Sequence, residues 1–247
     1  MALIFADKLN KVYGSGTTAV TALKDVSLEV TPGEFVAVMG PSGCGKSTLL
    51  HLLGGLDQPT SGTVSIDGQK LNGLTDDELT ELRRRNIGFV FQFFNLIPVL
   101  TARENAALPI TLDGAKSADA AAKAEEWLRK MEMGDRLDHR PDQLSGGQQQ
   151  RVAVARALTT DPALILADEP TGNLDTRSSD EIAALLRQVA NEWGRAVVVV
   201  THDPRIAAYA DRIIFLKDGS IVEEAVLEPK NKKNAEVVAQ KMTSYSN

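Results

Sequence analysis

The chain has 247 residues, and its 27 Lys and Arg against 33 Asp and Glu give a formal net charge of −6 at pH 7. This acidic balance argues against broad nucleic-acid binding, which requires a basic surface to replace the counterions condensed on phosphates. A single cysteine, Cys44, excludes an intramolecular disulfide framework and a multi-cysteine metal site, and it indicates a reducing compartment. The first residues lack a basic leader, and no apolar run approaches the roughly 20 residues of a membrane span, so we expect neither a signal peptide nor a transmembrane helix.

Short aliphatic runs alternate with longer segments of helical period, which predicts an α/β fold with a mostly parallel sheet. Residues 21–30 differ from the other runs, because polar and apolar side chains alternate up to the turn at Pro32-Gly33. That pattern predicts a half-exposed antiparallel strand. Residues 34–39 are almost wholly apolar and predict a strand covered on both faces.

The segment Gly40-Pro-Ser-Gly-Cys-Gly-Lys-Ser47 fits the phosphate-binding loop pattern, and an apolar helix is predicted directly after it at residues 47–56. Glycines let successive N–H groups turn toward the β-phosphate, the helix N-terminus adds partial positive charge, and Lys46 adds a full charge for the β- and γ-oxygens. Ser47 is placed to ligate Mg²⁺. Cys44 is expected to fill space beside the nucleotide, where a thiol label obstructs binding. The predicted nucleotide-binding residues of this segment are Gly40, Ser42, Gly43, Cys44, Gly45, Lys46, Ser47 and Thr48.

Residues 87–91 predict another strand, but strand signals nearly vanish between residues 101 and 160. Residues 115–131 are rich in Ala, Lys and Glu, and residues 146–158 have a helical period. We therefore predict a helical subdomain at about 93–160. It interrupts a core formed by residues 1–92 and 161–225.

A second predicted anion site lies in Leu144-Ser-Gly-Gly-Gln-Gln-Gln-Arg151, directly before the helix at 146–158. Its N–H groups, hydroxyl and positive helix end are suited to a γ-phosphate. One chain then has two sites that each fit a γ-phosphate. Both kinds of site can contact the same nucleotide only if the second site of one copy faces the phosphate-binding loop of another copy. The residues of this second site are Ser145, Gly146, Gly147 and Gln148.

Two acids follow the apolar strand predicted at 164–167. In a phosphate-loop NTPase, the first acid at such a strand end holds Mg²⁺ through water, and a carboxylate one residue later can polarise the attacking water. Asp168 is therefore predicted to be the metal-binding acid and Glu169 the general base.

A helix at 176–193 and strands at 197–201 and 212–216 complete the predicted α/β pattern. The tail at 226–247 is polar and is predicted to be a solvated terminus with a short helix at 235–242. Its clustered basic residues are Lys230, Lys232 and Lys233.

With these motifs in order, the chain from about Leu3 to Val222 resembles the ATP-binding-cassette ATPases, and the segment from Leu144 to Arg151 matches their signature motif. The resemblance implies a RecA-like P-loop NTPase core, an N-terminal antiparallel β subdomain and an inserted helical subdomain, all in one ATPase domain at 1–225. The chain is similar to the subgroup that serves lipoprotein release, macrolide export, haem export, peptide-antibiotic resistance and cell-division signalling. The segments that carry this similarity are 51–62, 86–92 and 168–175.

The resemblance also implies roles for individual residues. Tyr13 is expected to stack on adenine, although an ordinary strand tyrosine is the alternative. Gln92 is expected to reach Mg²⁺ and the attacking water, and residues 172–175, ending in Asp175, to touch the other monomer's phosphate-binding loop. His202 is expected to contact the γ-phosphate and orient the catalytic groups. The implied catalytic residues are Glu169, His202, Gln92 and Lys46, and the implied Mg²⁺ ligands are Ser47, Gln92 and Asp168.

The resemblance implies an ATP-hydrolysing subunit of a membrane transporter complex, in which ATP closes two copies head to tail. A separate integral membrane permease subunit would hold it at the cytoplasmic face of the inner membrane, for export, extraction or mechanical signalling. The segment at 93–100 is apolar at almost every position, and either it contacts the permease or it fills the joint between core and helical subdomain. The expected contact residues are Phe93, Phe94, Leu96 and Ile97.

The leading alternative is a soluble ATPase of the same superfamily that acts on nucleic acid or ribosomes. The segment between Lys46 and Ser145 has no heptads for the coiled-coil arms of DNA-repair members, and the sequence has one phosphate-binding loop where translation factors usually have two. A regulatory GTPase needs Asn-Lys-x-Asp, whereas residues 231–234 read Asn-Lys-Lys-Asn.

Overall fold

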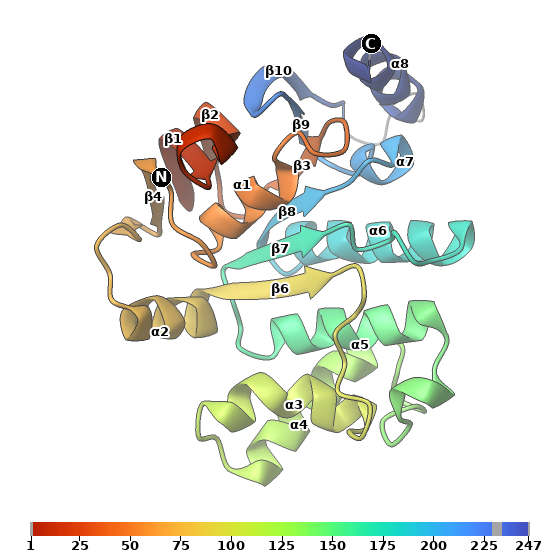
Figure 1. Ribbon diagram of the computed structural model, residues 1–247. Coiled ribbons are helices and arrows are strands. Elements are labelled where there is room, and N and C mark those ends of the chain that lie inside the picture. The colour runs from red at the N-terminus through yellow and green to blue at the C-terminus, as the bar shows by residue number, and fades with distance from the viewer. Residues whose placement is uncertain (1, 229–233, 247) are drawn as a thin grey trace.

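The structure, a computed structural model, describes residues 2–228 and 234–246. Two β-sheets lie on opposite sides of helix α1 (Lys46–Leu53), and the remaining long helices lie mainly on the far side of the larger sheet (Figure 1). The predicted lysine cluster of the tail and most of residues 231–234 lie outside the described residues.

The larger sheet is mostly parallel, as predicted, with the strand order β10-β9-β3-β8-β7-β6. The neighbouring pairs β9–β3, β3–β8, β8–β7 and β7–β6 are parallel, and β10 pairs antiparallel with β9 at one edge. The strands are β3 (Phe35–Met39), β6 (Ile87–Phe91), β7 (Leu164–Asp168), β8 (Ala196–Val200), β9 (Arg212–Lys217) and β10 (Ser220–Val226).

Strand β3 shows why the predicted parallel strands are apolar along their whole length. Val36 and Val38 face a core shared with α1 and the smaller sheet, whereas Phe35, Ala37 and Met39 face a core shared with the other helices. Successive side chains of a strand point to opposite faces, so a strand covered on both faces buries every position.

The smaller sheet is antiparallel, with the strand order β2-β1-β4-β5. Strand β2 begins at Val20 and ends at Val30, close to the predicted residues 21–30, and its outer positions are exposed in alternation. The sequence reading did not predict the other three strands. They are β1 (Ile4–Tyr13), β4 (Ser61–Ile66) and β5 (Gln69–Lys70).

Helices occupy the predicted helical segment and lie below the larger sheet in Figure 1. Two of the α-helices in this segment begin with capping boxes, Thr101 with Glu104 and Ser145 with Gln148, which satisfy N–H groups that the helix leaves free. Trp127 packs edge-on against Trp193 and so joins this segment to the core. The helices are α3 (Ala102–Leu112), α4 (Ser117–Lys130), α5 (Gly146–Leu158) and the 3₁₀ helix η2 (Pro141–Gln143).

Helix α6 (Thr176–Asn191) begins where the helix predicted at 176–193 begins and ends two residues before its predicted end. Helix α2 was not predicted, although Thr75 and Glu78 form a capping box at its start. The others are α2 (Asp76–Asn86), α7 (Pro204–Ala207), α8 (Asn234–Ser246) and the 3₁₀ helix η1 (Gly16–Thr18).

Helix α8 corrects the prediction of a solvated C-terminal tail. It packs on α7 beside β9 and β10, and Val238 is buried in the main core (Figure 1). Glu223 of β10 accepts hydrogen bonds from Lys241 and Tyr245, and the Tyr245 ring contacts Phe215. The helix predicted at 235–242 is present within α8, but the prediction of a solvated tail was wrong, because it rested on the polar composition and missed the few apolar and aromatic positions that reach the core.

Candidate functional site

Four functional segments meet at one edge of the larger sheet. Because the strands run parallel, the residues after β3, β6, β7 and β8 emerge at the same edge, here termed the carboxyl edge. These residues begin at Gly40, Gln92, Glu169 and Thr201. The topology therefore brings together motifs that are far apart in the sequence, where ligands of open α/β sheets usually bind.

The phosphate-binding loop joins β3 to α1 and has a shape that depends on glycine. Gly45 caps α1 with a φ of 104°, and a Cβ at this position would lie 2.4 Å from the carbonyl oxygen of Ala22. Gly43 has a φ of 79° and would point a Cβ into open space. Positive φ is unfavourable for other residues, so the loop depends on these glycines. The loop leads into the N-terminus of α1, where helical N–H groups without an intrahelical acceptor can bind an anion.

Lys46 is nearly buried in this loop. Its Nζ donates hydrogen bonds to the carbonyl oxygens of Gly40 and Pro41, both at 2.9 Å. These bonds hold a full positive charge beside the loop backbone, where it can also reach an anion.

A cavity of about 350 Å³ opens over the loop. Glu169 lines it just after the end of β7, and three residues of β2 also line it. The lining residues are Val20, Thr21, Ala22, Ser42, Gly43, Gly45, Lys46, Ser47, Thr48 and Glu169.

Ser47 and Asp168 form a pair of oxygen ligands beside this cavity. The Ser47 hydroxyl donates to Asp168 Oδ1 at 3.1 Å, which joins the first turn of α1 to the end of β7. Mg²⁺ usually takes one or two protein oxygens and completes its coordination with phosphate and water. The donor set therefore fits a Mg²⁺ ion that bridges the chain and a nucleotide.

Glu169 and His202 lie in direct contact. Glu169 Oε2 is 2.9 Å from His202 Nδ1, and the Glu169 N–H donates to the carbonyl oxygen of Val200 in β8. Glu169 has a φ of 46°, so its backbone lies in the strained left-handed region. The contact orients a carboxylate toward the cavity, and a carboxylate held in this way can accept a proton from water.

Gln92 and Asn173 hold two carboxyl-edge loops together. Gln92 Nε2 donates to Asn173 Oδ1 at 3.3 Å, and Asn173 Nδ2 donates to the Gln92 carbonyl oxygen at 3.1 Å. A Cβ on Gly172 would lie 2.7 Å from Gln92 Nε2, so the loops also touch. Gln92 itself is absent from the lining of the cavity over the phosphate-binding loop.

The signature residues also lie away from that cavity. Ser145 caps α5, and its hydroxyl accepts from the Gln148 N–H at 3.3 Å, but neither these residues nor Gly146 and Gly147 line the cavity. Asp175 caps α6, and hydrogen bonds from the Ser178 N–H and hydroxyl lower the pKa of its carboxyl.

Two predicted nucleotide contacts have other neighbours. The Cys44 side chain is buried against the smaller-sheet core and does not line the cavity, and burial raises the pKa of its thiol. The expectation that the Cys44 side chain fills space beside the nucleotide is therefore not met, because the loop turns it inward. Tyr13 is also absent from the lining, and its hydroxyl donates to Asp57 at 2.9 Å.

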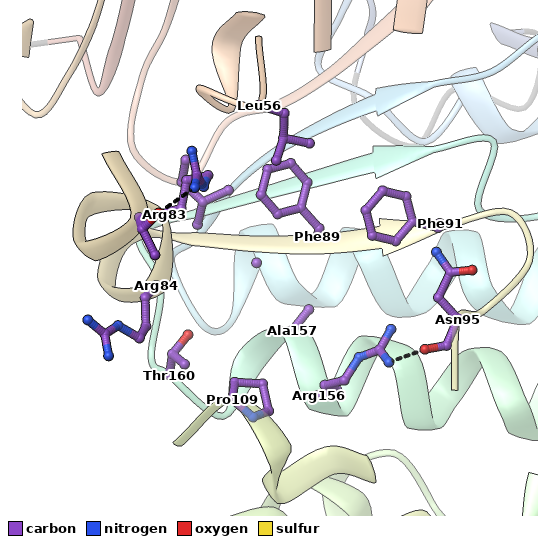
Figure 2. Close-up of a pocket in the computed structure, with 13 residues that line it drawn as sticks. Leu56, Arg83, Arg84, Phe89, Phe91, Asn95, Pro109, Arg156, Ala157 and Thr160 are labelled. Atoms are coloured by element: carbon purple, nitrogen blue, oxygen red, sulfur yellow. Dashed lines mark hydrogen bonds between the residues drawn. The ribbon is translucent and has the colours of Figure 1, made fainter. Parts of the chain in front are cut away.

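Sequence reasoning missed a basic, aromatic groove of about 450 Å³ between α2, β6 and the helical segment (Figure 2). Phe89 and Phe91 stack along β6 with their ring centroids 5.9 Å apart. The guanidinium of Arg156 donates to the carbonyl oxygens of Phe94 and Asn95 and so joins the groove to the loop after β6. Two features of the sequence could have indicated this groove: the alternating aromatic residues of β6 and the run of arginines in α2. The polar and aromatic lining residues include Arg83, Arg84, Phe89, Phe91, Asn95 and Arg156.

Comparison of the sequence with known proteins shows the family of this chain. The sequence profile of the family described as ABC transporter matches residues 23–172. The uncharacterized ABC transporter ATP-binding protein MJ0796 of Methanocaldococcus jannaschii is 52% identical, over 91% of this chain and 97% of that protein. The lipoprotein-releasing system ATP-binding protein LolD of Geobacter metallireducens is 50% identical, over 87% of this chain and 96% of that protein.

A solved dimeric structure of MJ0796, in a post-hydrolysis state with ADP and Pi, matches with a TM-score of 0.83 at 48% identity, and covers 91% of this chain and 99% of that chain. Within residues 2–228 and 234–246, the helices are all too short or too polar to cross a membrane. The family profile and the relatives together show that the chain belongs to the ABC transporter ATP-binding proteins, which hydrolyse ATP.

Proposed function

We propose that this chain is the ATPase subunit of a membrane transporter complex and that it uses Mg²⁺ with ATP. The observation that carries the proposal is the arrangement of Lys46, the Ser47–Asp168 pair and the Glu169–His202 pair around one cavity. A nucleoside triphosphate in this cavity would have its phosphates at the loop and its attacking water near Glu169.

The residues then have separate roles. Lys46 and the loop N–H groups bind the phosphates, and Ser47 and Asp168 hold Mg²⁺, which when bound neutralises charge on the phosphates. Glu169 takes the proton from the attacking water, and His202 keeps that carboxylate in place through the 2.9 Å contact. Gln92 does not line the cavity, and it would join the residues near Mg²⁺ and the attacking water if the loop after β6 moved toward the cavity.

We infer that two copies close head to tail around two ATP molecules. The signature residues lie outside the chain's own cavity, although they offer a hydroxyl and free N–H groups at the start of α5. The dimeric structure of the relative MJ0796 supports this assembly. In the dimer that we propose, Ser145, Gly146, Gly147 and Gln148 would meet the γ-phosphate held by the other copy, and Asp175 would approach the other copy's phosphate-binding loop.

We propose that a separate membrane permease subunit binds at the groove of Figure 2 and at the neighbouring loop after β6. Phe93 and Val99 in this loop are each 71% exposed, so the apolar segment does not all turn inward. The partner would place apolar side chains against Phe93, Ile97 and the β6 aromatics, and acidic groups near the groove arginines. It would hold the chain at the cytoplasmic face of the membrane as a peripheral subunit.

The similarity to LolD favours a complex of the lipoprotein-release and macrolide-export subgroup, which would export or extract a substrate or transmit a mechanical signal. The alternative, a soluble ATPase acting on nucleic acid or ribosomes, has less support. The acidic net charge of −6 opposes nucleic-acid binding, and the relatives reported above are transporter subunits.

The test combines Mg²⁺-dependent ATP hydrolysis with recovery of partners from the native membrane. Lys46→Ala should weaken ATP binding, because it removes a charge that contacts the phosphates in both ground and transition states. Lys70→Ala, in an exposed strand position, is the matched control and should bind ATP normally. Recovery of nucleic acid or ribosomes in place of a membrane protein would overturn the transporter assignment.

A further inference from the structure

Tyr13 lies at the rim of the phosphate cavity. It ends β1 and pairs in register with Val20 of β2, and Val20 lines that cavity. Tyr13 is 41% exposed, so a ligand can reach part of its ring. A flat exposed ring beside a triphosphate-sized cavity is suited to stack on a base.

Lys11 occupies a defined place over the Tyr13 ring. Its Nζ lies 4.8 Å from the ring centroid, within the range of a cation–π contact. The same ammonium donates to Asp57 Oδ1 at 2.6 Å and to the carbonyl oxygen of Gln58 at 2.8 Å. The Lys11 side chain is only 12% exposed, so these contacts fix it in one position. It covers one face of the ring, so a base would have to stack on the opposite face.

Asp57 holds both partners. Its Oδ1 accepts from Lys11 and from the Gln58 N–H, and its Oδ2 accepts from the Tyr13 hydroxyl at 2.9 Å. Partial burial alone would raise the pKa of this carboxyl, but the hydrogen bonds from Lys11 and Tyr13 outweigh it and lower the pKa. The carboxylate is therefore ionised at neutral pH and has acceptors for both donors.

Asp57 also connects the ring to the phosphate-binding loop. It follows α1 by a short turn, in which the Leu56 N–H donates to the carbonyl oxygen of His51. Helix α1 begins at Lys46, so the same rigid element carries the phosphate contacts at its N-terminus and the anchor of the ring beyond its C-terminus.

We propose that Lys11 and Asp57 are positioning residues that preset Tyr13 as the stacking platform for the purine base of ATP. This inference rests on the proposed function of the cavity. The base stacks on the ring face opposite Lys11, while the phosphates lie at the loop. Because the ring is held before the nucleotide arrives, less side-chain freedom is lost on binding, and affinity for the base-containing ligand rises.

The test compares Mg-ATP with inorganic tripolyphosphate, which has the phosphates but no base. Tyr13→Phe keeps the ring and removes only the hydroxyl bond, Lys11→Met removes the cation, and Asp57→Ala removes both anchors. Each should weaken ATP binding about threefold to tenfold, as expected when a preordered side chain becomes free, and leave tripolyphosphate binding unchanged. Lys70→Met is the control, and Lys11→Arg should keep most of the affinity because it keeps the cation.

A purely structural role for the cluster would lower both affinities together with the unfolding temperature. Coupling gives a further check, since Tyr13→Phe and Asp57→Ala share one bond and their combined loss should be smaller than the product of the single losses. Unchanged ATP affinity in Tyr13→Phe and Lys11→Met would overturn the inference. If the unmodified chain binds neither Mg-ATP nor tripolyphosphate, the proposed function itself is overturned.

Discussion

Replacement of Glu169 by Gln isolates the chemical step. Gln has nearly the same size and keeps an oxygen that can stay near His202, but it loses the negative charge and the ability to accept a proton from water. The backbone at this position, with its φ of 46°, is equally strained for either residue, so the fold should not change. Lys46, Ser47 and the loop N–H groups remain in place, and Mg-ATP binding should persist.

The expected size of the effect follows from the role of this carboxylate. Loss of general-base help usually lowers turnover by roughly 10² to 10⁴, which corresponds to about 2.7–5.5 kcal/mol of transition-state stabilisation. Glu169 is the carboxylate that lines the cavity, whereas Asp168 is engaged with Ser47 at 3.1 Å. A smaller loss is expected for His202→Ala, because it removes only the group that orients Glu169.

The assay measures steady-state phosphate release beside equilibrium binding of Mg-ATP, with Glu81→Gln on the exposed surface of α2 as the matched control. Size-exclusion chromatography of Glu169→Gln with and without Mg-ATP should show a nucleotide-dependent dimer, because the closed state no longer decays by hydrolysis. Turnover at the rate of the unmodified chain would refute the general-base assignment. Loss of ATP binding would show that the carboxylate acts in binding instead.

Four further outcomes are expected. Ser145→Arg should abolish hydrolysis while ATP binding to the monomer stays nearly intact, and Thr75→Ala, which loses a similar helix cap, should hydrolyse ATP normally in the same phosphate-release assay. GTP should be hydrolysed within about tenfold of ATP, since stacking discriminates poorly among purines, and competition kinetics would reveal a stronger preference. Phe93→Glu should prevent recovery of the membrane partner without lowering ATP binding, whereas Val226→Glu, at another exposed apolar position, should not; equal recovery would make the loop a simple joint. The thiol of Cys44 should react with iodoacetamide at least about tenfold faster in denaturant than in the folded chain, because burial raises its pKa and thiolate is the reactive form; equal rates would contradict its burial.

The parts of the fold that the sequence predicted well are those set by contiguous patterns. The phosphate-binding loop needs its glycines at fixed positions between a strand and a helix, and the buried strands need unbroken apolar runs. Helix α2 was missed although Thr75 and Glu78 carry a capping box, because its composition is highly charged and has only Leu79 and Leu82 buried. Strand β1 was missed because its polar and apolar residues follow no strict alternation, which fits its register shifts against β2.

The contacts within the site were less predictable because they join distant parts of the chain. The sequence singled out Glu169 and His202 separately, but their 2.9 Å contact depends on β7 and β8 being neighbours. Arg156 gave no local signal of its bonds to the loop after β6. The inward turn of Cys44 likewise follows from loop geometry, which residue type alone does not specify.

The paired hydrogen bonds between Gln92 and Asn173 make two surfaces of the molecule mechanically dependent on each other. Gln92 begins the loop that leads to the groove, and Asn173 lies in the loop that precedes Asp175. Because Gly172 also lies against the Gln92 side chain, we expect a displacement of one loop to displace the other. By thermodynamic linkage, a partner in the groove would then change the dimerisation constant by the same factor by which dimerisation changes affinity for the partner.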